Sequence, residues 1–148
     1  MRIALAADHA GYQLKDELAR WLREQGHDVS DLGTNGPESV DYPEYGMRLA
    51  QAIATGDAER GIAVCGSGIG ISIAVNREPK CRCARVDDPL SAELAREHND
   101  ANVLALGARL TGSDMARACV AAFLDTTFAG GRHQRRVNQL SQLLQESD

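Results

Sequence analysis

The chain has 148 residues, a length typical of one domain with a substantial buried core. Its apolar content of 43% is that of an ordinary globular protein, and its net charge of −5 gives no electrostatic reason to expect nucleic acid or an anionic membrane as a partner. No apolar run is long enough to span a membrane and the N-terminus lacks the features of a signal peptide, so we expect a cytoplasmic protein.

The first part of the chain predicts two strands and two helices. An apolar-rich strand at 2–7 precedes an amphipathic helix at 12–25, which Gly26 ends. A second strand at 27–32 precedes a loop rich in turn residues and a helix that begins at 41 and ends near 54. The side chains expected to face the core are Leu14, Leu18, Trp21 and Leu22 in the first helix, and Met47, Ala50 and Ile53 in the second.

The rest of the chain continues this alternation. Residues 62–64 form an apolar run that is too short for a helix and suited to a buried strand, and a helix begins near Ile69. The remaining elements are a strand at 81–86, a helix at 89–97 capped by Asp87 and Asp88, a strand at 102–106, a helix at 114–124 and a helical tail from about residue 130. Strands alternating with helices indicate a parallel sheet with helices on both faces, in a single domain over residues 1–148.

Four cysteines lie at positions 65, 81, 83 and 119, and none belongs to a Cys-x-x-Cys pair. Cys81 and Cys83 are too close along an extended chain to form an ordinary disulfide, so we expect free thiols. No two cysteines or histidines have the spacing of metal ligands. We therefore predict neither a metal site nor a cofactor.

The stretch after the third strand combines a thiol with bare backbone. Cys65 ends the strand, and Gly66, Gly68 and Gly70 alternate after it before a helix begins. In open parallel sheets, ligands bind outside the carboxyl ends of the strands. Glycines allow backbone N–H groups to approach a ligand closely, and the N-terminus of a helix is partly positive. The stretch is therefore suited to hold an anion or an oxyanion next to a thiol.

Other interpretations of this stretch fit less well. A dinucleotide-binding fingerprint needs its third glycine one residue after Gly70, although Asp87 lies at about the distance of a ribose contact. A P-loop needs a lysine that the stretch lacks, and a cysteine phosphatase loop needs an arginine where Ile71 stands. Cys65 as a small buried hydrophobic residue at a strand end stays open as an alternative.

Further polar residues lie at strand ends and beyond the sheet. Asp8-His9 and Asp87-Asp88 follow two other strands, and these strand ends share one edge of a parallel sheet with Cys65, which predicts one cleft. His98-Asn99 lies at the far end of its helix, while Arg132 and Arg136, four residues apart, follow the completed sheet. These last groups reach a cleft more easily in a second subunit. As alternatives, His98-Asn99 is a helix C-cap and the arginines form a solvated basic face.

Taken together, five spaced motifs resemble the type B ribose-5-phosphate isomerases. They are Asp8-His9, Asp41-Tyr42-Pro43, Cys65-Gly66-Ser67-Gly68-Ile69-Gly70-Ile71-Ser72, Arg96-Glu97-His98-Asn99-Asp100-Ala101-Asn102-Val103-Leu104 and Gly130-Gly131-Arg132-His133-Gln134-Arg135-Arg136-Val137. The resemblance, which runs from residue 1 to about 140, implies a Rossmann-like three-layer α/β sandwich with a five-stranded parallel sheet. It also implies a metal-independent isomerase that interconverts ribose 5-phosphate and ribulose 5-phosphate, as a homodimer or dimer of dimers with active sites between subunits.

The implied reaction gives roles to the catalytic candidates. Moving a proton between adjacent carbons through an enediolate needs a base, donors to the developing oxyanion and an anchor for the phosphate. Cys65 is the expected base, because a helix N-terminus favours the thiolate. Ser67 relays a proton between the sugar oxygens, and His98, with Asp8 nearby, opens the furanose ring.

The resemblance also implies which residues hold the substrate. The amides of the glycine-rich loop donate to the enediolate, while arginines and a histidine bind the phosphate. The phosphate group is assigned to His9, Arg132 and Arg136, with Arg109 as a further candidate, and the sugar hydroxyls to Tyr42 and Asn99. The expected substrate-binding set is Asp8, His9, Tyr42, Gly66, Ser67, Gly68, Ile69, Gly70, Asn99, Arg109, Arg132 and Arg136.

Three alternative functions remain at this point. The first is an isomerase of a six-carbon sugar phosphate, such as allose or galactose 6-phosphate. The second is a non-catalytic protein that binds a sugar phosphate. The third is a nucleotide-binding oxidoreductase, which the glycine spacing disfavours.

Overall fold

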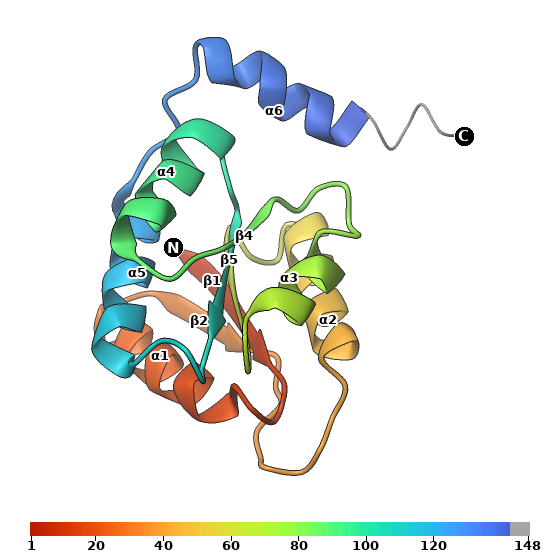
Figure 1. Ribbon diagram of the computed structural model, residues 1–148, viewed down its shortest axis with the longest axis vertical. Coiled ribbons are helices and arrows are strands. Elements are labelled where there is room, and N and C mark those ends of the chain that lie inside the picture. Colours follow the sequence, from red (N-terminus) through yellow and green to blue (C-terminus); the bar gives the residue numbers. More distant parts are fainter. Residues whose placement is uncertain (143–148) are drawn as a thin grey trace.

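The computed structural model describes residues 1–142 and contains a sheet of five strands (Figure 1). The strands are β1 (Arg2–Ala7), β2 (Asp28–Asp31), β3 (Arg60–Cys65), β4 (Cys83–Arg85) and β5 (Val103–Gly107). Their order across the sheet is β2-β1-β3-β5-β4, and every neighbouring pair is parallel. β3 is therefore the central strand, and all the strands end at the same edge of the sheet. The predicted fold class is confirmed.

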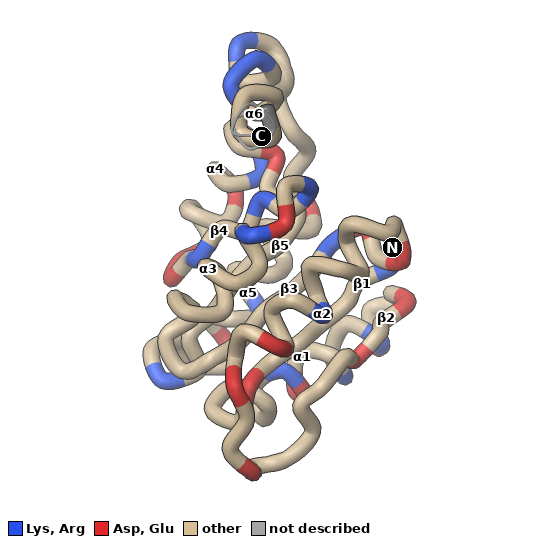
Figure 2. Tube along the Cα trace, turned by 90° about the vertical axis from the view of Figure 1, so that its right-hand side faces the viewer, with Lys and Arg blue, Asp and Glu red and all other residues tan. Residues whose placement is uncertain are grey.

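Helices cover both faces of this sheet. They are α1 (Tyr12–Glu24), α2 (Tyr42–Ala54), α3 (Ile69–Val75), α4 (Pro89–Asn99), α5 (Ser113–Asp125) and α6 (Arg132–Gln142). α1, α4 and α5 pack on one face and α2 and α3 on the other, while α6 lies beyond the end of the sheet next to α4 (Figures 1 and 2). The part of the predicted helical tail after residue 142 lies outside the described residues. Among the described helices, none has both the length and the apolar character that a membrane crossing requires.

The two faces of the sheet bury side chains of different size. Toward α1, α4 and α5 the strands present mainly large residues, and toward α2 and α3 mainly small ones. The small side chains leave room for Leu49 of α2 and Ile71 of α3, both fully buried. Because side chains alternate along a strand, Cys65 at the end of β3 points to the α2–α3 side. The small residues on that side are Ala4, Ala6, Ala63 and Ala105.

One predicted core position is wrong. Met47, expected to face inward, is 62% exposed. The packed face of α2 consists instead of Tyr45, Gly46, Leu49 and Ala50. A Cβ built on Gly46 would lie only 2.8 Å from the Cβ of Ala74, so this glycine is what permits α2 to pack tightly on α3. The prediction placed the large apolar side chain of Met47 in the contact between helices, whereas α2 and α3 contact each other at Gly46.

The fourth strand is shorter than predicted, at Cys83–Arg85 instead of 81–86. Asparagine side chains bond the backbone at its start. The side chain of Asn102 bonds the Arg82 amide at 2.7 Å and the Lys80 carbonyl at 2.8 Å. Asn76 bonds the amide and the carbonyl of Cys83 at 2.8 and 3.0 Å. The backbone groups at this end are therefore satisfied by side chains as well as by a neighbouring strand.

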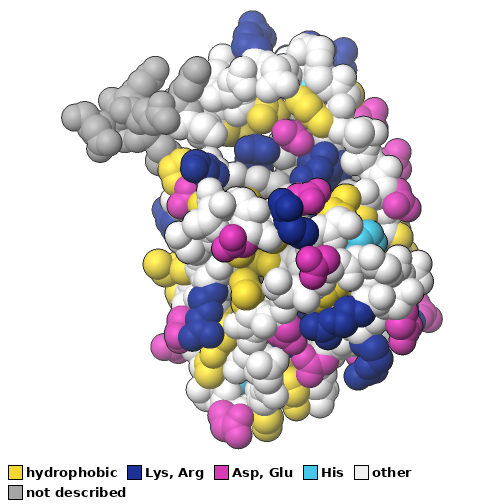
Figure 3. Space-filling model, turned by 180° about the vertical axis from the view of Figure 1, so that it is seen from behind, with side chains coloured by type: hydrophobic (Ala, Val, Ile, Leu, Met, Phe, Trp, Pro, Cys, Tyr) yellow, Lys and Arg dark blue, Asp and Glu magenta, His cyan; other side chains and the backbone are white. Residues whose placement is uncertain are grey.

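Charged side chains of both signs are mixed on one face of the molecule. On the face seen in Figure 3, Lys and Arg side chains lie among Asp and Glu side chains. Neighbouring opposite charges form pairs such as Arg117–Asp114 on α5, at 2.6 Å. α6 is different, because it contains three arginines and no acidic residue over Arg132–Gln142 (Figure 2). A basic helix at one end of an acidic chain is a candidate site for an anion.

Lys15 is a fully buried lysine that joins three segments. Its Nζ donates to both carboxylate oxygens of Asp31 and to Asp16 at 2.7 Å, and to Asn35 at 3.1 Å. These bonds connect α1 with the edge strand β2 and with the loop that follows it. An ammonium group without water needs such partners, because an unpaired buried charge is strongly destabilising.

Replacing Lys15 with methionine should lower the free energy of unfolding by about 2–4 kcal/mol, because Asp31 and Asn35 lose their shared donor. The chain's other lysine, Lys80, is exposed and supplies the control, since Lys80→Met should change the value by less than about 0.5 kcal/mol. Urea denaturation measures both changes. Equal stabilities of the two variants would contradict the role given to Lys15.

Candidate active site

A cavity of about 380 Å³ opens at the carboxyl ends of the central strands. It lies where β1, β3 and β5 end, at the edge of the sheet predicted to hold the cleft. Eight of the predicted site residues are brought together here. The lining residues are Asp8, His9, Ala10, Tyr42, Cys65, Gly66, Ser67, Gly70, Arg109 and Leu110.

Cys65 is the last residue of β3, and its sulfur has a polar partner. The side chain is only 4% exposed, yet the residue borders the cavity. The amide of Gly68 donates a hydrogen bond to Cys65 Sγ over 3.2 Å. A hydrogen bond to sulfur favours the charged form over the neutral one. α3 has only seven residues, so this single amide is a more direct source of stabilisation than the helix on which the sequence prediction relied.

The other amides of the loop divide into two groups. The Ile69 amide already has a hydrogen-bond partner within the loop, because it donates to Ser67 Oγ at 3.1 Å. Within residues 1–142, no carbonyl or side chain accepts from the amides of Gly66, Ser67 or Gly70. These three N–H groups are the donors that remain for a ligand oxygen.

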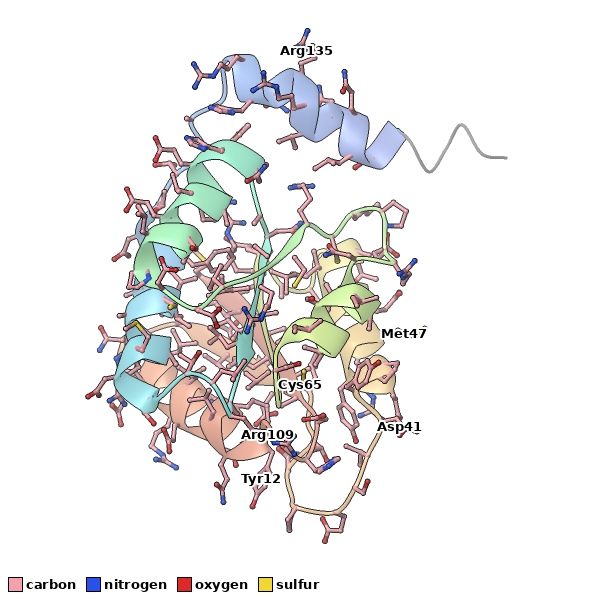
Figure 4. All side chains as sticks on the ribbon, viewed as in Figure 1. Tyr12, Asp41, Met47, Cys65, Arg109 and Arg135 are labelled. Atoms are coloured by element: carbon pink, nitrogen blue, oxygen red, sulfur yellow. The ribbon has the colours of Figure 1, made fainter. Side chains whose placement is uncertain are left out.

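Two larger side chains lie over the glycine-rich loop. A Cβ on Gly70 would be 2.7 Å from Cζ of Tyr42, and a Cβ on Gly66 would be 3.3 Å from Nη1 of Arg109. Glycine at both positions therefore lets the phenol ring and the guanidinium approach the backbone closely. Figure 4 shows Arg109 and Cys65 at the same end of the molecule. The cavity thus contains a cationic side chain near the thiol.

Asp8 and His9 border the cavity from the end of β1. Asp8 is buried, and its Oδ1 accepts from the amides of Ala10 and Gly11 at 3.0 and 3.1 Å. His9 Nδ1 lies 3.1 Å from the Val40 amide nitrogen and 3.2 Å from its carbonyl oxygen. Because an amide can only donate, we assign Nδ1 as the acceptor and place the ring proton on Nε2. His9 can then donate from Nε2 to an anion.

Gly68 and Ile69 belong to the same loop as the cavity residues, and the other four predicted residues lie at the opposite end of the molecule. The His98 ring at the end of α4 stacks on that of His133 in α6, with ring centroids 4.5 Å apart. Arg132 and Arg136 are exposed on α6, and Asn99 borders a separate cavity of about 390 Å³. In Figure 4, Arg135 of the same helix lies far from Cys65. One chain therefore does not bring the two groups of predicted residues together.

The helix containing His98 ends differently from the alternative considered above. The C-cap of α4 is Asp100, with φ 47°, rather than His98-Asn99. The Asp100 carboxylate forms ion pairs with two arginines, Arg96 at 2.8 Å and Arg82 at 3.3 Å. The pKa of His133 is lowered by burial and then by the positive charge of His98 and its arginine neighbours.

Sequence reasoning missed Arg85, the last residue of β4. Its Nε donates to the carbonyl of Ser67 over 3.0 Å, so it contacts the glycine-rich loop from outside the cavity. Its Nη1 forms an ion pair with Asp87 at 2.6 Å. The available signal was its position at the end of the strand that precedes Asp87-Asp88, a pair that the sequence already placed at this edge of the sheet.

The remaining cysteines lie outside the cavity that Cys65 borders. Burial raises the pKa of Cys81 to about 12 and that of Cys119 to about 11, and it also raises the pKa of Cys83. Thiols of this kind stay protonated and unreactive near neutral pH. Among the described residues, no group of three or more His, Cys, Asp and Glu side chains is arranged to hold a metal ion.

The chain is similar to known proteins over nearly its whole length. The family described as Ribose/Galactose Isomerase matches residues 3–140. The chain is 44% identical to ribose-5-phosphate isomerase B of Escherichia coli (strain K12), over 97% of each protein. The structure of ribose-5-phosphate isomerase B from Clostridium thermocellum has a TM-score of 0.98 at 45% identity and covers 100% of both chains. That from Mycoplasma genitalium with bound ribulose-5-phosphate has a TM-score of 0.93 at 35% identity, covering 98% of this chain and 97% of that one.

Proposed function

Because the chain belongs to the ribose/galactose isomerase family, we propose that it interconverts ribose 5-phosphate and ribulose 5-phosphate with Cys65 as the base. The observation that carries this proposal is the Cys65 sulfur, which borders a cavity and accepts a hydrogen bond from the Gly68 amide at 3.2 Å. A thiolate held in this way can take a proton from carbon. The neighbouring amides can bind the charge that develops on oxygen.

The reaction moves hydrogen within the sugar. The Cys65 thiolate removes the proton from carbon 2 of the open-chain aldose, and the electron pair moves to the oxygen on carbon 1. The Ser67 hydroxyl passes a proton from the oxygen on carbon 2 to that on carbon 1. The Cys65 thiol then returns its proton to carbon 1, and carbon 2 becomes the ketone. No electrons leave the substrate, so no redox cofactor is needed.

The intermediate is an enediolate, whose negative oxygen needs donors. The amides of Gly66, Ser67 and Gly70 supply these, and one such donor is typically worth about 3 kcal/mol to the transition state. Tyr42 lies over the same loop and orients a sugar hydroxyl. Asp8 is held by two amides and assists at the ring oxygen together with His98.

The site is divided between two chains. His9 and Arg109 border the cavity of Cys65, whereas His98, Asn99, Arg132 and Arg136 act from a second subunit. We therefore propose a homodimer, or a dimer of dimers, with each site made by two chains. Ile69 and Ile73 of α3, both about half exposed, support a contact surface on this helix.

Further properties belong to the same proposal. The enzyme is independent of metals and acts in the cytoplasm, where four free thiols stay reduced. Its partner is a small sugar phosphate, and the net charge of −5 supports no role for nucleic acid. A six-carbon sugar phosphate is the alternative substrate, which competition between ribose and allose phosphates would distinguish.

The function is tested by following carbon-bound hydrogen. Incubation with ribose 5-phosphate in heavy water and EDTA should yield ribulose 5-phosphate and should exchange the carbon-2 proton for deuterium, as seen by NMR. Binding without exchange would indicate a sensor and not an enzyme. Loss of activity in EDTA that a divalent metal restores would contradict the metal-independent mechanism.

Replacing Arg136 with alanine should raise KM for ribose 5-phosphate by about tenfold or more with a smaller effect on kcat, because a charged hydrogen bond to the phosphate is lost. Arg135, exposed on the same helix, supplies the matched control, and Arg135→Ala should leave KM unchanged. Steady-state kinetics of both variants decide the point. Equal KM values in the two variants would remove Arg136 from the phosphate site.

A further inference from the structure

The peptide group between Ser67 and Gly68 is held at both of its ends. Its carbonyl oxygen accepts a hydrogen bond from Nε of Arg85 at 3.0 Å. Its N–H, which belongs to Gly68, donates to Cys65 Sγ at 3.2 Å. A continuous path of hydrogen bonds therefore runs from the guanidinium at the end of β4, through one peptide group, to the sulfur at the end of β3.

We propose that Arg85 is a positioning residue that acts on Cys65 through this peptide group. It holds the peptide so that the Gly68 N–H points at the sulfur, and its charge makes that N–H a stronger donor. Both effects favour the thiolate form of Cys65. The importance of that form for catalysis rests on the proposed function, whereas the effect on the sulfur does not.

The orientation of the peptide needs to be held. Gly68 has φ 77° and ψ −10°, the angles of the third residue in a type II turn. The peptide before this residue is the one that differs in orientation between type II and type I turns, and glycine adopts either. Flipping it would turn the N–H away from Cys65. Arg85 can bond the Ser67 carbonyl only when the peptide group has the orientation in which the Gly68 N–H donates to Cys65 Sγ.

The charge of Arg85 adds to this effect. A hydrogen bond from an ionised donor is roughly twice as strong as a neutral one, and it polarises the peptide to which it binds. Polarisation makes the opposite N–H more positive, and a stronger hydrogen bond to the charged form of a thiol favours that form. Asp87 fixes the guanidinium through the 2.6 Å ion pair to Nη1, and the Arg85 side chain is only 25% exposed.

Other ionisable groups also face the sulfur, and they set the background for any pH profile. Asp8 and His9 follow β1, Tyr42 begins α2, and Arg109 follows β5. Arg85 differs from all four because it reaches Cys65 through a hydrogen-bonded peptide. Its effect can therefore be separated from theirs by changing Arg85 alone.

The test compares Arg85→Met, Arg85→Lys and the control Arg117→Met, which removes an ion-paired arginine on α5. The rate of Cys65 alkylation by iodoacetamide is measured against pH, with the modified peptide identified by mass spectrometry, and kcat/KM is measured over the same range. Both profiles should rise with the thiolate. In Arg85→Met their midpoints should move up by about one pH unit, with a smaller upward shift in Arg85→Lys and none in Arg117→Met.

Midpoints equal to those of the wild type in both Arg85 variants would overturn the proposal. A fall in kcat without a shifted midpoint would do the same, because it would indicate a disturbed loop and no effect on the sulfur. If Arg85→Met does not fold, Arg85→Lys alone decides by the presence or absence of its upward shift. The alkylation profile tests the proposal even if the wild type lacks isomerase activity, so the two failures are distinguishable.

Discussion

Replacing Cys65 with alanine should lower kcat for ribose 5-phosphate by about 10²–10⁴-fold, the range expected when a general base is removed. The variant should also stop exchanging the carbon-2 proton in heavy water. The remaining cysteines cannot take over, because they lie outside the cavity and stay protonated. Steady-state kinetics and NMR measure the two effects.

The fold should survive this change. Cys65 loses one sulfur atom at the border of a cavity, so the loss of stability should be about 1 kcal/mol. Cys119→Ala is the matched control, because Cys119 lies on α5, fully buried in the core on the opposite face of the sheet from Cys65. It should lose stability and keep its activity. Near-normal turnover by Cys65→Ala would refute the thiolate base.

Replacing Gly68 with alanine should reduce kcat by about 100-fold and destabilise the protein by about 1–3 kcal/mol. Gly68 has a positive φ of 77°, which costs a residue with a side chain. A Cβ at this position would lie 2.8 Å from the carbonyl carbon of Leu106 and 3.0 Å from the amide nitrogen of Gly107. Both are backbone atoms of β5, which cannot move aside. The loop must shift instead, and the N–H bond to Cys65 is lost.

Gly112 supplies the control for this experiment, because it also precedes a helix. Its φ is −73°, and nothing lies within 4 Å of an added Cβ. Gly112→Ala should therefore leave kcat unchanged and cost less than about 1 kcal/mol. Thermal unfolding and kinetics on both variants separate the two positions. Equal behaviour of the two variants would mean that the conformation of Gly68 is unimportant to the site.

The sequence was sufficient for the sheet because its signals are local. Short apolar runs that alternate with segments of helical periodicity indicate βαβ units. Gly26, with φ 91°, follows the end of α1 as predicted. The same reasoning placed Cys65 and Asp8 at one edge, since parallel strands end together. The position of Asp88 directly before Pro89 predicted that it caps α4. In the structure its carboxylate accepts a hydrogen bond from the Ser91 amide at 2.8 Å.

Features that depend on contacts between elements could not be predicted in this way. Met47 was expected to face the core, but α2 packs closely on α3 at Gly46 and Met47 is exposed. A residue without a side chain adds nothing to a hydrophobic pattern, so the pattern could not indicate this contact. The path from Arg85 to Cys65 depends on which strands are neighbours across the glycine-rich loop. By contrast, the separation of Cys65 from α6 was expected, because His98-Asn99 lies at the far end of its helix and α6 follows the completed sheet (Figure 4).

The two ends of the molecule are anchored very differently. β3 is bonded to strands on both sides, so the backbone that carries Cys65 is released only when the whole domain unfolds. α6 is not part of the sheet, and it is attached through side-chain contacts such as the His98–His133 stack and the bond from Ser141 to the Pro79 carbonyl at 3.1 Å. On gentle warming, a helix of this kind detaches before the domain melts. The affinity of the enzyme for substrate should therefore fall at temperatures at which the strand that carries Cys65 is still folded.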